Sequence, residues 1–129
     1  MSAKKLKIMV LDDEPIVCKR LQPALEKLGY EVDTFTQSLE ALHEIQETAY
    51  DIIITDLKMK GIDGMRFLQE AKKRHPATEV IVITGFATLD TAKESFHHGV
   101  FDFIAKPFKL SEIQEVVTKA ATKIRGAAV

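Results

Sequence analysis

Five short apolar runs alternate along the chain with longer segments whose apolar residues recur at helical spacing. The runs cover residues 6–11, 31–36, 51–55, 79–84 and 101–105. Runs one, three and four are almost continuously apolar, as expected for parallel strands covered on both faces. The second run places Val32, Thr34 and Thr36 between polar or aromatic neighbours. This lower apolar content predicts a strand at an edge of the sheet.

Helix boundaries are marked by proline, glycine and polar residues. The first helix begins near Pro15, which a first turn tolerates, and ends before Gly29. Ser38 is the predicted N-cap of the second helix, and the third ends before Pro76. The fourth covers residues 88–98 and has only a thin apolar stripe, made of Leu89, Ala92 and Phe96.

A fifth helix is predicted near the end of the chain from the stripe Ile113, Val116, Val117, Ala120 and Ile124. Alternation of strands and helices is typical of an α/β fold, here a doubly wound parallel sheet with helices on both faces. Right-handed crossovers then bring the C-terminal ends of all strands to one edge, where such folds bind ligands.

The length and charge of the chain limit the number of domains and the kinds of partner that it can have. A chain of 129 residues fits a single domain, 1–129, whose core we expect at about residues 6–125. A net charge of −1 gives no general attraction to nucleic acid or to a membrane surface. No signal peptide is visible, and the only cysteine, Cys18, cannot form an internal disulfide. We therefore expect a cytoplasmic protein with no direct contact to nucleic acid or membrane.

Charged and polar residues follow or end four of the apolar runs. Asp12 and Asp13 follow the first run, Asp56 the third and Lys106 the fifth, while Thr84 ends the fourth. Carboxylates gathered at one edge repel each other unless a cation joins them, and Mg²⁺ prefers such oxygen ligands. A single aspartate at a strand end is usually a loop or capping residue. The whole set on one edge instead favours a divalent-metal site beside a carboxylate that can be modified.

These residues resemble the receiver domain of two-component response regulators, over about residues 6–125. The resemblance implies a flavodoxin-like sheet in the order 2-1-3-4-5 with five helices. It is carried by four motifs in the expected order and spacing: Asp12-Asp13-Glu14, Asp56-Leu57-Lys58-Met59 with Gly61-Ile62-Asp63-Gly64, Thr84-Gly85, and Lys106-Pro107.

The resemblance also implies a metal site and a phosphorylation site. Asp56 would be the phosphoacceptor, modified by a histidine kinase or a phosphotransfer protein. Asp13 would bind Mg²⁺ directly, with Mn²⁺ as the alternative ion, and Asp12 would act through water. Asp56 and the backbone carbonyl of Lys58 would complete the metal shell. Thr84 would then donate its hydroxyl to a phosphoryl oxygen.

Further residues would couple phosphorylation to an output. Lys106 would pair with the phosphoryl group, and Phe103 would turn inward when the threonine moves. The face formed by the fourth helix, fifth strand and fifth helix would contact an output domain or target protein. The receiver would be a monomer or a dimer promoted by phosphorylation. Lys58 and Phe86 would tune the phosphoryl lifetime, with Lys58 pairing to Glu14.

The sequence departs from the family pattern at two positions, and the family pattern also implies the geometry of one peptide bond. Lys60 stands where proline is common, and Phe103 stands where tyrosine is common, so its inward state must rest on packing. The Lys106–Pro107 bond is expected to be cis, which is accessible mainly before proline.

Two other functions remain open from the residues alone. A Mg²⁺-dependent phosphatase would also use an aspartyl nucleophile, but it usually carries an Asp-x-Asp motif after the first strand and a larger cap. A nucleotide- or flavin-binding module would need a glycine-rich first turn. The Asp-Asp-Glu-Pro turn at residues 12–15 would instead repel a phosphate without a metal. A switch keeps its phosphoryl group, whereas a phosphatase turns over added phosphoesters.

Overall fold

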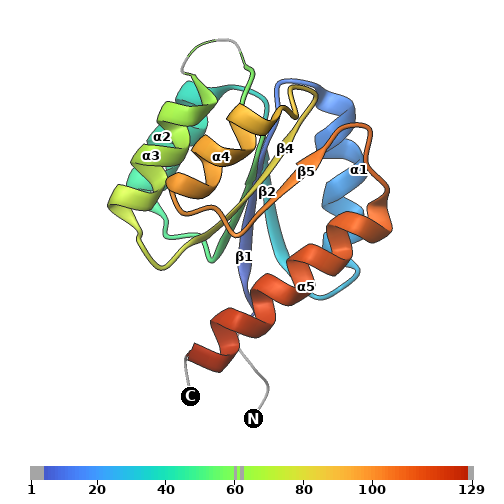
Figure 1. Cartoon of the computed structure of the whole chain (residues 1–129). Coiled ribbons are helices and arrows are strands. Elements are labelled where there is room, and N and C mark those ends of the chain that lie inside the picture. Colours follow the sequence, from blue (N-terminus) through green and yellow to red (C-terminus); the bar gives the residue numbers. More distant parts are fainter. Residues whose placement is uncertain (1–4, 60, 62, 128–129) are drawn as a thin grey trace.

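The computed structural model describes residues 5–59, 61 and 63–127, and within them one parallel sheet lies between two layers of helices (Figure 1). The strand order is β2-β1-β3-β4-β5, and every neighbouring pair is parallel. This confirms the doubly wound fold and places the second apolar run at an edge. The strands are β1 (Lys7–Leu11), β2 (Glu31–Phe35), β3 (Ile52–Thr55), β4 (Glu79–Thr84) and β5 (Asp102–Ala105).

The helices divide between the two faces of the sheet. Helices α1 (Pro15–Glu26) and α5 (Leu110–Ala127) cover one face, and α2 (Ser38–Glu47), α3 (Gly64–Arg74) and α4 (Leu89–His97) lie on the other (Figure 1). Successive strand residues point to opposite faces, so each strand contributes to two cores. In β1, for example, Ile8 and Val10 pack in the core of α1 and α5, whereas Met9 and Leu11 pack in the core of α2 and α3.

Two details of the helices on the second face differ from the sequence prediction. Ser38 is the first residue of α2, and Gln37 occupies the N-cap without a side-chain hydrogen bond. The predicted apolar stripe of α4 is wrong for Leu89 and Phe96, which are 71% and 50% exposed. The helix is rotated so that Ser95 is its buried residue, and the Ser95 hydroxyl donates to the carbonyl of Thr91 at 2.8 Å.

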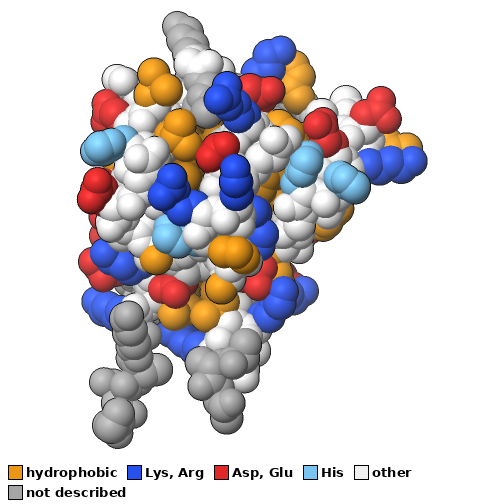
Figure 2. All heavy atoms as spheres, turned by 90° about the vertical axis from the view of Figure 1, so that its left-hand side faces the viewer, with side chains coloured by type: hydrophobic (Ala, Val, Ile, Leu, Met, Phe, Trp, Pro, Cys, Tyr) orange, Lys and Arg blue, Asp and Glu red, His pale blue; other side chains and the backbone are white. Residues whose placement is uncertain are grey.

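The remaining expectations concern the surface and two loops. On the face formed by α2, α3 and α4, acidic and basic side chains are interspersed, in keeping with the small net charge (Figure 2). The Lys106–Pro107 peptide is cis, as the family pattern implies. Lys60 and Ile62 lie outside the described residues. Among the described residues, no helix has the length and apolar character that crossing a membrane requires.

Candidate functional site

The C-terminal ends of β1 and β3 hold two carboxylates side by side. The backbone N–H of Asp12 donates to the carbonyl of Phe35 at 3.0 Å, and that of Asp56 donates to the carbonyl of Leu11 at 3.1 Å. These bonds extend the parallel ladder one residue beyond each strand. Both aspartates are buried, at 0% and 5% exposure. The sheet itself therefore fixes where the two acids lie.

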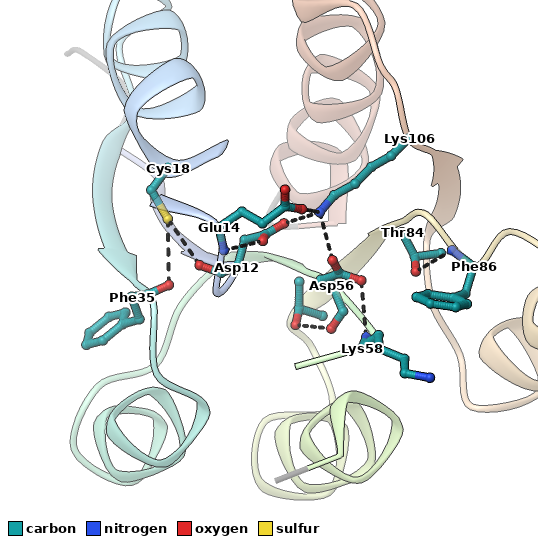
Figure 3. Close-up of polar contacts among 10 residues, drawn as sticks. Asp12, Glu14, Cys18, Phe35, Asp56, Lys58, Thr84, Phe86 and Lys106 are labelled. Atoms are coloured by element: carbon teal, nitrogen blue, oxygen red, sulfur yellow. Dashed lines mark hydrogen bonds and ion pairs between the residues drawn. The ribbon is translucent and has the colours of Figure 1, made fainter. Parts of the chain in front are cut away.

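Lys106 reaches across the sheet edge and joins three carboxylates (Figure 3). Its Nζ lies 2.8 Å from Oδ2 of Asp56, 2.8 Å from Oδ2 of Asp12 and 2.6 Å from Oε1 of Glu14. Its backbone N–H donates to the carbonyl of Thr84 at 2.8 Å, which anchors the lysine beside β4. One ammonium thus faces three acids, and the cluster keeps an excess of negative charge.

Burial and pairing act in opposite directions on the charged groups of this site. Burial raises the pKa of Asp12, against the lowering effect of Lys106 and of the Glu14 N–H, and the charge of Asp56 adds a small further rise. Burial alone would lower the pKa of Lys106, but its contacts with the carboxylates of Asp12, Asp56 and Glu14 raise it above its usual value. The acid with the perturbed pKa therefore owes that shift first to desolvation and only secondarily to crowding.

The donor set fits a hard divalent cation. Asp12, Glu14 and Asp56 each offer a carboxylate oxygen, and these oxygens lie within 4.8 Å of one another. Oδ1 of Asp12 accepts the N–H of Glu14 at 2.9 Å. Oδ2 of Asp12, although buried and in ionic contact with Lys106, has no partner in hydrogen-bonding geometry. A buried carboxylate oxygen with unused bonding capacity beside other acids matches the ligand preference of Mg²⁺.

The acids that lie together in the structure are not the same three that the sequence pattern grouped as metal ligands. Glu14 joins the acid cluster, and its only sequence signal was its place in the Asp-Asp-Glu motif. Asp13 is half-buried and lines a cleft of about 440 Å³ beside Pro15, Leu39 and Gly61. The backbone of Lys58 approaches Asp56, since its N–H donates to Oδ1 at 3.2 Å. The roles of Asp13 and of the Lys58 carbonyl as metal ligands stay predictions.

Thr84 and Phe103 lie on neighbouring strands near the acid cluster. Thr84 is buried, and its Oγ1 accepts the N–H of Phe86 at 3.1 Å. Phe103 pairs with Val82 in the sheet register and is half-buried against the core of α2 and α3. The ring of Phe103 is therefore neither fully buried nor fully exposed.

The two proposed tuning residues contact each other at the mouth of the site. Nζ of Lys58 lies 4.4 Å from the centroid of the Phe86 ring, in cation–π geometry. The expected pair between Lys58 and Glu14 is wrong, because Glu14 is held by Lys106 instead. Phe86 is about half exposed, so the contact lies on the surface of the protein.

Comparison with known proteins decides the family. The sequence profile of the response regulator receiver domain matches residues 8–118. The chain belongs to this family. The receiver is 31% identical over 125 residues to the transcriptional regulatory protein ZraR of Klebsiella oxytoca, covering 97% of this chain and 28% of that protein. It is 33% identical over 113 residues to the DNA-binding transcriptional regulator NtrC of Escherichia coli K12, covering 88% and 24%. The receiver thus spans about a quarter of the length of these relatives.

Solved structures agree with the family assignment. A receiver domain protein from Clostridium thermocellum matches with a TM-score of 0.85 at 34% identity, covering 93% of this chain and 97% of that one. NtrX from Brucella abortus matches at 0.88 and 30%, covering 97% and 28%. A CheY-like receiver domain protein from Methanospirillum hungatei has a TM-score of 0.92 at 24% identity, covering 96% and 99%, and it supports the fold alone. The protein is therefore a receiver of two-component signalling, a class of phosphoacceptors, which favours a switch over the phosphatase and nucleotide-binding alternatives.

Proposed function

We propose that the protein is a phosphorylation-dependent switch with Asp56 as its phosphoacceptor. A histidine kinase or phosphotransfer protein supplies the phosphoryl group, and the face of α4, β5 and α5 passes the change to an output domain or target protein. The observation that carries the proposal is the placement of Asp56. Its carboxylate is buried, with Oδ2 in contact with Lys106 and Oδ1 accepting the N–H of Lys58. Two further acids lie beside it.

Phosphoryl transfer to Asp56 is a displacement at phosphorus. A carboxylate oxygen of Asp56 forms the new P–O bond while the P–N bond to the donor histidine breaks, and the imidazole nitrogen keeps the electron pair. Lys106 lies within reach of the new phosphoryl oxygens and places a positive charge where negative charge gathers. Asp12, Asp13 and Asp56 with the Lys58 carbonyl would hold Mg²⁺ or Mn²⁺, which when bound offsets the charge of the phosphoryl oxygens.

The switch would act through Thr84 and Phe103. The Thr84 hydroxyl already accepts the Phe86 N–H, so its own proton is available to donate to a phosphoryl oxygen. Movement of Thr84 toward Asp56 opens space that the half-buried Phe103 ring can fill. Helix α4 follows this strand end and buries only Ser95 among its own residues, so little packing resists its displacement.

Intact-mass measurement after incubation with acetyl phosphate and Mg²⁺ tests the proposal. The unaltered protein should gain one phosphoryl group, and Asp56→Asn should gain none. Asp63→Asn is the matched control, because Asp63 is an exposed aspartate close in sequence whose capping bond to the Met65 N–H an asparagine can still accept. Labelling of Asp56→Asn to the level of the control would overturn the assignment of the phosphoacceptor.

A further inference from the structure

Glu14 is the carboxylate of the site for which the proposed function assigns no role. Its Oε1 makes the shortest of the three contacts to Lys106, at 2.6 Å, although its side chain is 58% exposed. The other two contacts, to Asp12 and Asp56, are with buried side chains at 2.8 Å. An ammonium has three N–H donors. Lys106 donates hydrogen bonds to Glu14 and Asp56, and it makes an ionic contact with Asp12 that lacks hydrogen-bonding geometry.

The local backbone aims Glu14 at the lysine. Its N–H donates to Oδ1 of Asp12, and Pro15 restricts the preceding residue to an extended backbone, here φ −90° and ψ 107°. Glu14 occupies the N-cap of α1, but it is not one of the short polar residues whose side chains usually accept a helix N–H at that position. It makes no such bond and reaches across to Lys106 instead (Figure 3).

A phosphoryl group on Asp56 must compete for this occupied ammonium. Three carboxylates surround the ammonium, so one of these contacts has to open before a phosphoryl oxygen can take its place beside Lys106. Asp12 and Asp56 are buried and fixed by the strand ladder, so water cannot readily replace the lysine there. Glu14 is exposed and has a flexible side chain, so water can take over its hydrogen bond on release.

We propose that Glu14 is a positioning residue that holds Lys106 at rest and gives it up when the phosphoryl group arrives. The inference rests on the proposed role of Asp56 as the phosphoacceptor. Since the contact must break before Lys106 can serve the phosphoryl group, it slows phosphorylation. Loss of the contact should speed phosphorylation by roughly two- to fivefold, the range set by an exposed ion pair. The increase should shrink as salt screens the pair.

Two variants separate the positioning role from simple charge repulsion. Glu14→Gln removes the charge, and Glu14→Asp keeps it but shortens the reach by one methylene. If Glu14 positions Lys106, both variants should be phosphorylated faster by acetyl phosphate at saturating Mg²⁺. If Glu14 only repels the anionic donor, Glu14→Asp should match the unaltered protein, and that result would overturn the proposal. Glu26→Gln, an exposed glutamate at the end of the same helix, is the control.

A second readout needs no phosphodonor. Lysine ammonium protons exchange slowly with water when carboxylates surround the ammonium and hydrogen-bond it, so ¹⁵N NMR should detect the Lys106 ammonium in the unaltered protein and in Glu26→Gln. Its signal, identified by its loss in Lys106→Gln, should broaden through faster exchange in both Glu14 variants. An unchanged Lys106 signal in Glu14→Gln would overturn the resting contact. Failure of every protein to accept phosphate at Asp56 would instead reject the proposed function and leave the NMR result to decide the contact.

Discussion

Replacing Gly64 by alanine should destabilise the fold and displace the segment that carries Asp56. A Cβ added at Gly64 would lie 2.5 Å from both the Cα and the carbonyl oxygen of Leu57, and 2.6 Å from the carbonyl oxygen of Asp56. All three are backbone atoms, so no side chain can rotate to make room. The Asp56 backbone is itself held by its N–H bond to Leu11. Relief of the clash therefore requires movement of the β3–α3 connection.

The expected loss of stability in Gly64→Ala is the difference between two opposing effects. Overpacking costs about 1 to 3 kcal/mol, and contact with backbone atoms places Gly64→Ala toward the upper end. Alanine is the better helix former at the start of α3, which returns about 0.5 to 1 kcal/mol. The net loss in the free energy of unfolding is then about 2 kcal/mol. For a chain of this length that corresponds to a fall in Tm of roughly 6 to 10 °C.

Urea unfolding followed by circular dichroism measures this loss, and Gly85→Ala is the matched control. Gly85 also follows a strand of the site, but a Cβ there meets no atom within 4 Å. Its substitution should change stability by less than about 0.5 kcal/mol. The Gly64→Ala midpoint should fall with an unchanged slope, and its phosphorylation by acetyl phosphate should slow. Equal midpoints for the two variants would refute the tight backbone contact.

Three further perturbations test the site and its surroundings. Lys106→Ala should be phosphorylated at least tenfold more slowly by acetyl phosphate, because it lacks the charge that offsets the phosphoryl oxygens; an unchanged rate would exclude that role. Phe86→Ala should shorten the phosphoryl lifetime a few-fold, a barrier change below about 1.4 kcal/mol, and a longer lifetime in a time course of intact mass would mean that the ring does not hinder attack by water. Burial and the hydrogen bond to Asp33 raise the pKa of Tyr50 above 10.0. The stability contributed by that hydroxyl is therefore complete below pH 10 and lost as the pH rises above it. Tyr50→Phe should lose about 1 to 2 kcal/mol at pH 7 and should show a shallower decline than the unaltered protein in urea melts between about pH 9 and 11, whereas parallel declines would contradict the raised pKa.

The fold and the location of the site could be predicted because both depend on periodicity and chain direction. Apolar runs of strand length between helical segments determine a parallel sheet, and right-handed crossovers bring the strand ends to one edge. Asp12, Asp56 and Lys106 follow those ends directly, and the strand order that brings them close was implied by the resemblance to receiver domains. The structure brings the three together, as the sequence indicated.

Side-chain direction and helix rotation could not be predicted in the same way. Asp13 and Glu14 are adjacent acids, yet Glu14 faces Lys106 while Asp13 lines a cleft toward α2. That choice depends on the turn between Asp12 and Pro15, which a pattern of charges does not specify. Similarly, the spacing of Leu89 and Phe96 marks one side of α4, but it cannot tell whether that side meets the sheet or the solvent.

The unfavourable electrostatics of the site would support the proposed switching. The raised pKa of Asp12 means that the folded state binds this proton more tightly than the unfolded state. Its contribution to stability is complete below the usual value of 3.8 and is lost as the pH rises through the folded pKa, so ionised Asp12 destabilises the fold at neutral pH. Lys106 offsets this only in part, because it is shared with Glu14 and Asp56. An event that changes the charge at this edge changes this electrostatic cost. A covalent group would shift the populations of two conformations if that cost differs between them, and this is what the proposed switch requires.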